Sequence, residues 1–312
     1  WQKSLLSWRD IEGKAKGQFD WYHSDGVVYS TAGVGLKLIA RVDFAPDWAR
    51  SDHASNGPPD YVQDYADFIY ALVSHYSQSN PYGRIHAIEV WNEPNLAREW
   101  GGQKPDALGY VLLLKAAYEA AKRADPTVVV ISAGLSPTGT NNDQAIPDDA
   151  FLQQMYDAGA RDYFDVLGAH APGYKAPPEM SPDQVAADPG YGGNRVFTFR
   201  RVEDLRDVMV RNGDGGKQVW ITEFGWTTDT LHPEYSWFAV SEDQKADYLV
   251  RAFQWARNRW APWIGVMTVW TMPDPAWPDQ REETWWAITN TNGTVKPSYT
   301  RLLQARQTGI LP

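Results

Sequence analysis

Cysteine is absent from this chain of 312 residues. Without a thiol there can be no disulfide, no thiolate zinc site and no cysteine nucleophile. Long hydrophobic runs are absent as well: none reaches the roughly 18 apolar residues of a membrane-spanning helix. The composition is therefore that of a globular protein, and a chain of this length can bury one large core, as single-domain α/β barrels often do.

Positive charge is in short supply. Lysine and arginine total 29 against 39 aspartates and glutamates, which gives a formal net charge of −10 and an isoelectric point near 5.1. Such a chain gains little from a phosphate backbone, so we expect no nucleic-acid partner. None of the six histidines is spaced four residues from another histidine or from an acid, so we expect no metal site and no cofactor.

Aromatic residues, by contrast, are abundant: the chain has 16 tryptophans and 16 tyrosines. A tryptophan is costly to bury completely because its indole N–H needs a hydrogen-bond partner. Sugar rings stack their C–H faces on indoles, so one interpretation is an aromatic-lined carbohydrate cleft. The alternative, large aromatics wedged between a barrel and its helices, is expected to account for more than half of them.

Short apolar runs alternate with longer amphipathic segments along nearly the whole chain. The runs predict strands at Leu36–Val42, Ile85–Trp91, Thr127–Ser132, Phe164–Ala169, Gln218–Thr222 and Ile264–Trp270. The amphipathic segments predict helices at Asp60–Ser79, Ala107–Arg123, Val202–Arg211 and Asp243–Arg259. Several of the runs are nearly continuous in Val, Ile, Leu and Ala, which is typical of parallel strands buried on both faces. This alternation predicts an α/β fold, a single (β/α)8 TIM-barrel domain over residues 1–312.

Two glutamates stand at the ends of predicted strands. Glu93 lies in the run Ile-Glu-Val-Trp-Asn-Glu-Pro-Asn of residues 88–95, and Glu223 in the run Val-Trp-Ile-Thr-Glu-Phe-Gly-Trp of residues 219–226. In a barrel the carboxyl ends of all strands meet at one mouth, so both carboxylates are expected there. The alternative for either glutamate is a helix cap or an ion pair with a nearby arginine.

Glycoside hydrolysis needs such a pair of carboxyl groups. One gives a proton to the leaving oxygen, and the other attacks the anomeric carbon as a carboxylate. We expect Glu93 to be the acid/base and Glu223 the nucleophile, with their carboxyl groups about 5–5.5 Å apart, the retaining separation. Asn92, beside Glu93, is expected to hold the sugar 2-hydroxyl.

The runs Trp91-Asn92-Glu93-Pro94 and Ile221-Thr222-Glu223 resemble the clan of retaining (β/α)8 glycoside hydrolases, and within it the family 39 and cellulase-like members. Supporting stretches are Gly35–Leu38, Ala45–Ala49, Asp165–His170, Val269-Trp270 with Asp274, and Asn292–Tyr299. The resemblance covers nearly the whole chain. It implies that the acid/base ends barrel strand 4 and that the nucleophile ends strand 7.

The resemblance also implies roles for other residues. Trp270, after the last strand, matches the tryptophan that floors the −1 subsite, with a core indole as the alternative. His170 and Tyr174 match a region that supplies an imidazole or an aromatic ring near the nucleophile, with a hydrogen-bonded loop histidine as the alternative. Arg41 would steady the site or pair with an acid outside it. Trp226 is expected among the substrate-binding aromatics of the loops.

One departure from the clan concerns the first residues. Trp1–Trp8 resembles barrel strand 2, with Lys3 where an arginine is usual, so the first β/α unit is expected to be missing. Glu93 would then follow the third strand of this chain, and Glu223 would end the sixth.

The expected function is hydrolysis of β-glycosidic bonds in a polysaccharide or oligosaccharide. The expected partner is carbohydrate, with no membrane association and an extracellular or cell-surface location. A catalytically weak carbohydrate-binding barrel is the alternative, but it should have lost one of the two glutamates. An aldolase or isomerase would want a strand-end lysine or a metal cluster, and the sequence offers neither. Sugar, linkage and oligomeric state do not follow from the sequence.

Overall fold

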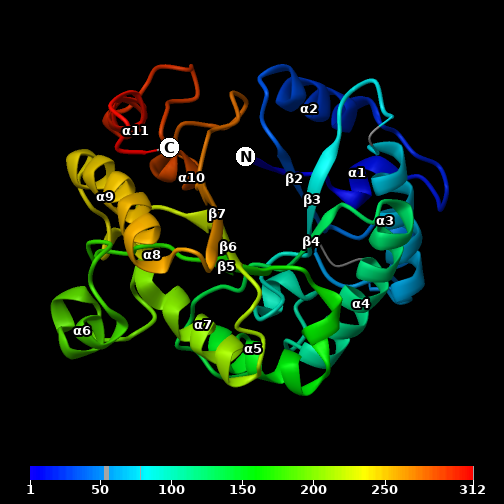
Figure 1. Ribbon diagram of the computed structural model, residues 1–312, viewed down its shortest axis with the longest axis horizontal. Helices are drawn as coiled ribbons and strands as arrows, with labels where there is room; N and C mark the ends of the chain where they lie inside the picture. The colour runs from blue at the N-terminus through cyan, green and yellow to red at the C-terminus, as the bar shows by residue number, and fades with distance from the viewer. Residues whose placement is uncertain (53–55, 78, 312) are drawn as a thin grey trace. The chain divides into compact units, whose positions relative to one another are not determined.

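A computed structural model describes residues 1–52, 56–77 and 79–311, along which strands and helices alternate (Figure 1). The strands are β1 (Gln2–Leu5), β2 (Leu38–Val42), β3 (Ile85–Val90), β4 (Val129–Ser132), β5 (Leu167–His170), β6 (Val219–Phe224) and β7 (Ile264–Val269). The longer helices are α2 (Tyr22–Gly33), α3 (Val62–His75), α4 (Ala107–Ala124), α5 (Asp148–Asp157), α7 (Val202–Arg211), α9 (Glu242–Trp255) and α11 (Pro297–Gln307). Shorter ones are α1 (Trp8–Glu12), α6 (Pro182–Ala187), α8 (Pro233–Ser236) and α10 (Glu283–Trp286). No helix of these residues is long and apolar enough to cross a membrane.

The predicted alternation is confirmed, with shifts of a few residues at the ends of elements. The strand expected from Phe164 begins at Leu167. Before it, Val166 makes an isolated parallel bridge to Ile131, and the Asp165 carboxylate accepts a hydrogen bond from the backbone N–H of Val130 (2.7 Å). The helix expected over Asp60–Ser79 is α3, which ends at His75; Gln78 lies outside the described residues.

The chain divides into two compact units. Unit 1 consists of Trp1–Ala169 and Val208–Trp220, and unit 2 of His170–Asp207 and Ile221–Pro312. In unit 1 the strands β1, β2, β3 and β4 form a parallel sheet in that order. A second sheet has the order β5-β6-β7. The strands thus follow one another in sequence order within each sheet, as expected for repeated β/α units.

In unit 1, two tyrosines tie the helices to the ends of the strands. Helices α3 and α4 lie side by side next to the sheet (Figure 1). The hydroxyl of Tyr65, on α3, donates to the carbonyl of Val42 at the end of β2 (2.6 Å). Tyr110, on α4, donates to Val90 at the end of β3 (3.0 Å). Both tyrosines are fully buried, so the carboxyl ends of these strands are held by hydrogen bonds inside the core.

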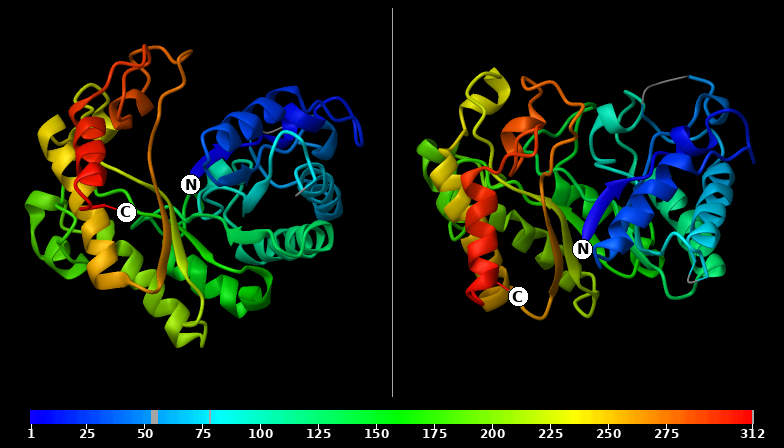
Figure 2. Two further views of the ribbon diagram at one scale, coloured as in Figure 1. Left: turned by 45° about the horizontal axis from the view of Figure 1, so that its top comes forward. Right: turned by 90° about the horizontal axis from the view of Figure 1, so that it is seen from above.

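In unit 2, the loop after β7 is held by a buried lysine. Helix α9 begins at a capping box formed by Ser241 and Gln244, and it lies beside α11 in both views of Figure 2. Lys245, on α9, donates to the carbonyls of Trp285 (2.9 Å) and Ala287 (2.8 Å). Burial lowers the pKa of Lys245 to about 7. The lysine therefore donates to two backbone carbonyls at α10, and the Trp285 carbonyl also accepts from the backbone N–H of Thr228 (3.3 Å).

Lys3 occupies the position where the resemblance leads one to expect arginine, and it makes a buried ion pair. Its ammonium lies 2.7 Å from the Glu89 carboxylate on β3, and the two side chains are 9% and 0% exposed. Glu89 also accepts a hydrogen bond from the backbone N–H of Gly134 (3.2 Å). A carboxylate this deeply buried needs a cation close by, because an uncompensated charge in the core is costly.

Replacing Lys3 with methionine is therefore expected to lower the free energy of unfolding by about 3 kcal/mol, because the Glu89 charge loses its partner. Urea unfolding followed by circular dichroism measures this. Lys3→Arg should stay within about 1 kcal/mol of the original, and the double variant Lys3→Met/Glu89→Leu should recover most of the loss. Equal stability of Lys3→Met and the original chain would show that the pair contributes nothing.

Candidate active site

Glu93 lies three residues beyond the end of β3, at a sharp turn of the chain. Trp91 and Glu93 have positive φ angles of 75° and 39°, a region that residues other than glycine seldom adopt. The turn is held in place because the backbone N–H of Glu93 donates to the carbonyl of Gly134 (3.1 Å) and that of Leu96 donates to the carbonyl of Glu93 (2.9 Å). Left-handed residues of this kind concentrate at functional sites.

Buried neighbours keep this turn rigid. The indole of Trp91 is fully buried and donates to the carbonyl of Glu99 (2.9 Å). The amide of Asn95, also fully buried, donates to the carbonyls of Ser136 and Ile146 (2.9 Å each) and accepts from the backbone N–H of Ser136 (3.0 Å). The segment that carries Glu93 is thereby fixed to the loop between β4 and α5.

The carboxylate of Glu93 pairs with Arg98, whose Nη2 lies 3.0 Å from Oε2. This side chain of Glu93 is 13% exposed, while that of Arg98 is 69% exposed. An ion pair to so exposed an arginine contributes little to stability. An ion pair with a nearby arginine was the alternative role considered for Glu93. The pair with Arg98 does not, however, explain why the chain holds Glu93 at a strained turn.

A second carboxylate, Glu99, lies close to Glu93. It accepts a hydrogen bond from the amide of Asn56 (2.6 Å), and its Oε1 lies 3.6 Å from Nε of Arg98. Burial raises the pKa of Glu99, and the nearby charge of Glu93 raises it further. Neither Arg98 nor Glu99 was expected to belong to the site. The signal for them was a pair of opposite charges in the short turn Ala97–Glu99, directly after the Asn-Glu-Pro-Asn run.

The structure brings Arg41 and Asn92 together, as expected for residues of one site. Nη1 of Arg41, on β2, donates to Oδ1 of Asn92 (3.3 Å), and its Nε lies 3.4 Å from the fully buried carboxylate of Asp43. Arg41 therefore contacts both an acid and the residue next to Glu93, and its role in steadying the site stays a prediction. The Nδ2 group of Asn92 donates to no described residue, so it is available to a ligand.

In unit 2, the structure brings His170 and Glu223 together. Glu223 is the fifth residue of β6, and its carbonyl accepts from the backbone N–H of Ala171 (2.9 Å). His170 ends β5, and its Nε2 lies 3.7 Å from Oε1 of Glu223. The two side chains are 3% and 17% exposed. The imidazole thus stands next to the expected nucleophile, at the position that the resemblance implied.

Trp270 follows the last residue of β7 and is a partly exposed residue. Its backbone N–H donates to the carbonyl of Phe224 (2.8 Å), directly after Glu223. A Cβ atom at Gly225 would lie 2.7 Å from the carbonyl oxygen of Trp270, so only glycine permits this close approach. The Glu-Phe-Gly run therefore keeps Glu223 and Trp270 on adjoining strand ends.

Tyr174 and Trp226 were both expected to contact substrate, and they differ in their exposure to solvent. Tyr174 is partly exposed and packs against an aromatic group made of Phe197, Trp237 and Phe238. Trp226, however, is 0% exposed, and its indole N–H donates to the carbonyl of Ala176 (3.0 Å). The prediction that Trp226 binds substrate is wrong: its ring is a core residue of unit 2, enclosed by neighbours that include Phe199 and Tyr248.

Glu93 belongs to unit 1 and Glu223 to unit 2. The expected separation of their carboxyl groups stays a prediction, as do the catalytic roles. Within residues 1–52, 56–77 and 79–311, no three histidine, aspartate or glutamate side chains are grouped so that they could hold a metal ion.

Comparison with solved structures gives the class of the fold: it is that of the (β/α)8-barrel glycoside hydrolases. A family 39 glycoside hydrolase from Bacteroides cellulosilyticus WH2 is similar over 95% of this chain and 56% of its own, with 21% identity and a TM-score of 0.65. A family 39 β-xylosidase from Caulobacter crescentus is similar over 97% and 64%, with 20% identity and a TM-score of 0.66. The family 53 catalytic domain of Ignisphaera aggregans is similar over 96% and 84%, with 15% identity and a TM-score of 0.59.

Among curated proteins, the chain is 28% identical over 179 residues to a β-xylosidase from Geobacillus stearothermophilus. That match covers 54% of this chain and 33% of the relative, so the chain matches about a third of the relative's length. No family model matches. These likenesses confirm the resemblance to family 39. Glu93 follows the third strand of the described residues and Glu223 lies on the sixth, the order expected when strands are counted from barrel strand 2.

Proposed function

We propose that this protein is a retaining β-glycosidase in which Glu93 is the acid/base and Glu223 the nucleophile. The observation that carries the proposal is the environment of the two glutamates. Each stands at the carboxyl end of a strand, Glu93 beside Asn92 and Glu223 beside His170. The likeness of the fold to family 39 enzymes supports the same conclusion.

The proposed reaction runs in two displacements. The carboxylate of Glu223 attacks the anomeric carbon while the bond to the leaving oxygen breaks and Glu93 gives that oxygen its proton, which leaves a sugar ester on Glu223. Glu93, now ionised, takes a proton from water, and the resulting oxygen attacks the anomeric carbon and releases Glu223. Two inversions restore the original β configuration.

The other residues support these two steps. Asn92 offers its Nδ2 group to the sugar 2-hydroxyl, a contact that strengthens in the transition state, and Arg41 holds the other end of that amide. His170 orients the Glu223 carboxylate from 3.7 Å away. Trp270, a partly exposed residue, offers its indole to the C–H face of the sugar. In this proposal these residues only bind or position the substrate and the two carboxyl groups, and they transfer no proton.

β-Xylosides are the substrates that we propose first, because the curated relative is named a β-xylosidase. A location outside the cell or on its surface would suit a polymeric substrate, and we propose it on that ground. A barrel that only binds carbohydrate is not favoured, since both carboxylates are present. Glu93 is contacted by Arg98 and Glu223 by His170.

A panel of aryl β-glycosides, led by the β-xyloside, tests the proposed function. We expect hydrolysis of at least one member, and proton nuclear magnetic resonance during the first turnovers should show the β-anomer of the free sugar before it mutarotates. First appearance of the α-anomer would establish inversion and rule out the covalent intermediate. Failure to hydrolyse any member of the panel would contradict the assignment as a glycosidase.

A further inference from the structure

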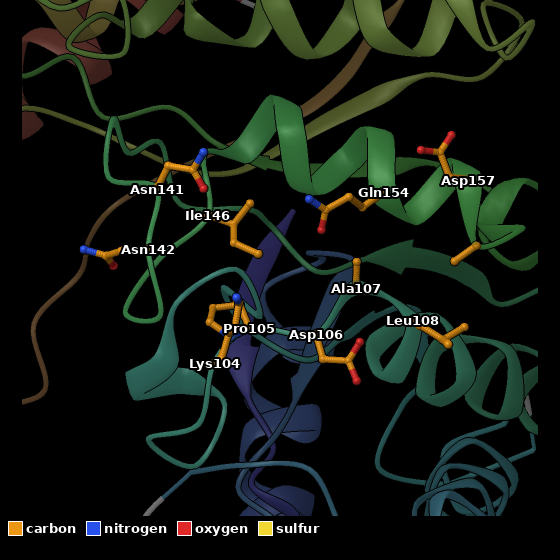
Figure 3. Close-up of a pocket in the computed structure, with 11 residues that line it drawn as sticks. Lys104, Pro105, Asp106, Ala107, Leu108, Asn141, Asn142, Ile146, Gln154 and Asp157 are labelled. Carbon is orange, nitrogen blue, oxygen red and sulfur yellow. The ribbon is translucent and has the colours of Figure 1, made fainter.

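A cavity of about 890 Å³ lies in unit 1, outside the residues of the candidate active site. Figure 3 shows that its lining side chains come from three segments: the chain that enters α4, the loop before α5, and α5 itself. Its volume lies within the range of about 300–1,000 Å³ that is usual for small-molecule sites. The cavity is therefore large enough for an oligosaccharide segment.

Polar groups with unused hydrogen-bonding capacity line this cavity. Asn141 and Gln154 are exposed to solvent, and their side-chain amides make no hydrogen bond to any described residue. Asn142 uses its Oδ1 to accept from the backbone N–H groups of Gln144 and Ala145, and its Nδ2 group donates to no described residue. Asp106 precedes the first turn of α4 without capping it. The cavity therefore offers amide donors and acceptors together with a carboxylate.

Apolar side chains complete the lining. Pro105, Ala107 and Ile146 are buried beneath the surface of the cavity, while Leu108 is 57% exposed at its edge. A concave site with apolar walls and a few polar groups is the usual form of a ligand site. Such a lining suits a pyranose ring, which has a C–H face and a hydroxyl edge, each hydroxyl being both donor and acceptor.

The charges of the lining disfavour other ligands. Asp106 and Asp157 are acidic, and the single lysine, Lys104, is paired with Asp143 outside the lining (3.2 Å). An anion would meet two carboxylates with no unpaired cation. A metal ion is disfavoured too, since no three acidic or histidine side chains among the described residues are grouped to bind one. A neutral, hydroxyl-rich ligand is the class that remains.

One residue that lines the cavity, Ile146, is hydrogen-bonded to the segment that carries Glu93. The side chain of Ile146 lines the cavity, and its backbone N–H donates to the carbonyl of Asn95 (3.0 Å). The buried Asn95 amide returns a bond to the carbonyl of Ile146 (2.9 Å). Asn95 stands two residues after Glu93, so a ligand in the cavity would be held at a fixed place relative to the catalytic segment.

We propose that this cavity is a second carbohydrate-binding site, which takes a neutral oligosaccharide segment of the substrate away from the bond that is cleaved. The proposal rests on the proposed function. A chain held at two places stays near the enzyme after the first contact dissociates, because the second binding event is intramolecular. The site would thus favour polymeric over short substrates.

Hydrogen exchange measured by mass spectrometry tests the proposal, with xylohexaose as the probe and the Glu223→Ala variant as the host, so that the probe is not consumed. We expect slower exchange in residues 104–108 and 141–158 when xylohexaose is added. In the same host, Asn141→Ala/Gln154→Ala should raise the concentration needed for half of this effect about tenfold, because two hydrogen bonds are lost. Gln18→Ala/Gln63→Ala removes two exposed amides elsewhere in unit 1 and should leave it unchanged.

The same measurement separates this proposal from the proposed function. Slower exchange around Glu93 and Glu223, together with hydrolysis of an aryl β-glycoside by the original chain, reports on the active site. If those signals appear while residues 104–108 and 141–158 exchange as before, the second site does not exist. Protection of the cavity that the double variant retains in full would also overturn it. Protection that the double variant loses supports the second site even in a chain that hydrolyses nothing.

Discussion

Turnover of an aryl β-glycoside is expected to fall by about 10⁵-fold or more when Glu223 is replaced by alanine, because β6 carries no second carboxylate. Sodium azide should restore part of the rate, since a small anion fits the space left by the side chain and attacks the anomeric carbon directly. One displacement then replaces two, so the product should be the α-glycosyl azide. Steady-state rates and nuclear magnetic resonance of the azide product measure both effects.

A second glutamate of unit 2 provides the control. Glu203 accepts hydrogen bonds from Arg200 (3.0 Å) and from the indole of Trp260 (2.7 Å), so its role is structural. Glu203→Ala should lower stability and leave the turnover number within a few-fold of the original. A Glu223→Ala variant that is folded and keeps near-normal turnover would remove Glu223 from the mechanism, as would azide rescue that gives the β-glycosyl azide.

The parts of the fold that sequence reasoning predicted are those set by periodicity. Strands such as Ile85–Val90 consist mainly of apolar residues because both faces are buried, and α3 repeats its buried residues at helical spacing. The ends of the elements were less predictable, because single side chains decide them. The Asp165 carboxylate, two residues before β5, bonds to a backbone group 35 residues away in the sequence.

The candidate site shows the same division. The positions of Glu93, Glu223 and His170 at or near the carboxyl ends of strands could be predicted from the apolar runs before them, while their roles stay predictions. Trp226 could not be placed in the same way. It stands three residues after Glu223, but the bare Gly173 backbone leaves room for its ring, since a Cβ there would lie 1.9 Å from the indole. Such a fit between distant segments decides whether an indole is buried, and composition carries no information about it.

The loss of Glu93 is expected to depend on the leaving group. Glu93→Ala should slow the hydrolysis of an alkyl or sugar β-glycoside by roughly 10²–10⁴-fold, because these leaving oxygens need a proton. A dinitrophenyl glycoside needs no such proton, so its first displacement should be nearly unaffected. Its second displacement should be slow because water loses its base, and a burst of dinitrophenol equal to the enzyme concentration should precede the steady state. Stopped-flow absorbance measures the burst.

Azide distinguishes this defect from that of Glu223→Ala. Azide needs no base, so in Glu93→Ala it should attack the sugar ester on Glu223 and give the β-glycosyl azide, with the configuration opposite to that formed by Glu223→Ala. Glu119→Ala removes an exposed glutamate of α4 in the same unit and should behave as the original chain. Equal losses of Glu93→Ala on alkyl and dinitrophenyl glycosides, with no burst, would mean that Glu93 holds the substrate or the fold and does not transfer the proton. In that case Glu99, whose pKa is raised by burial and by the charge of Glu93, becomes the carboxyl group of unit 1 to test next as the acid.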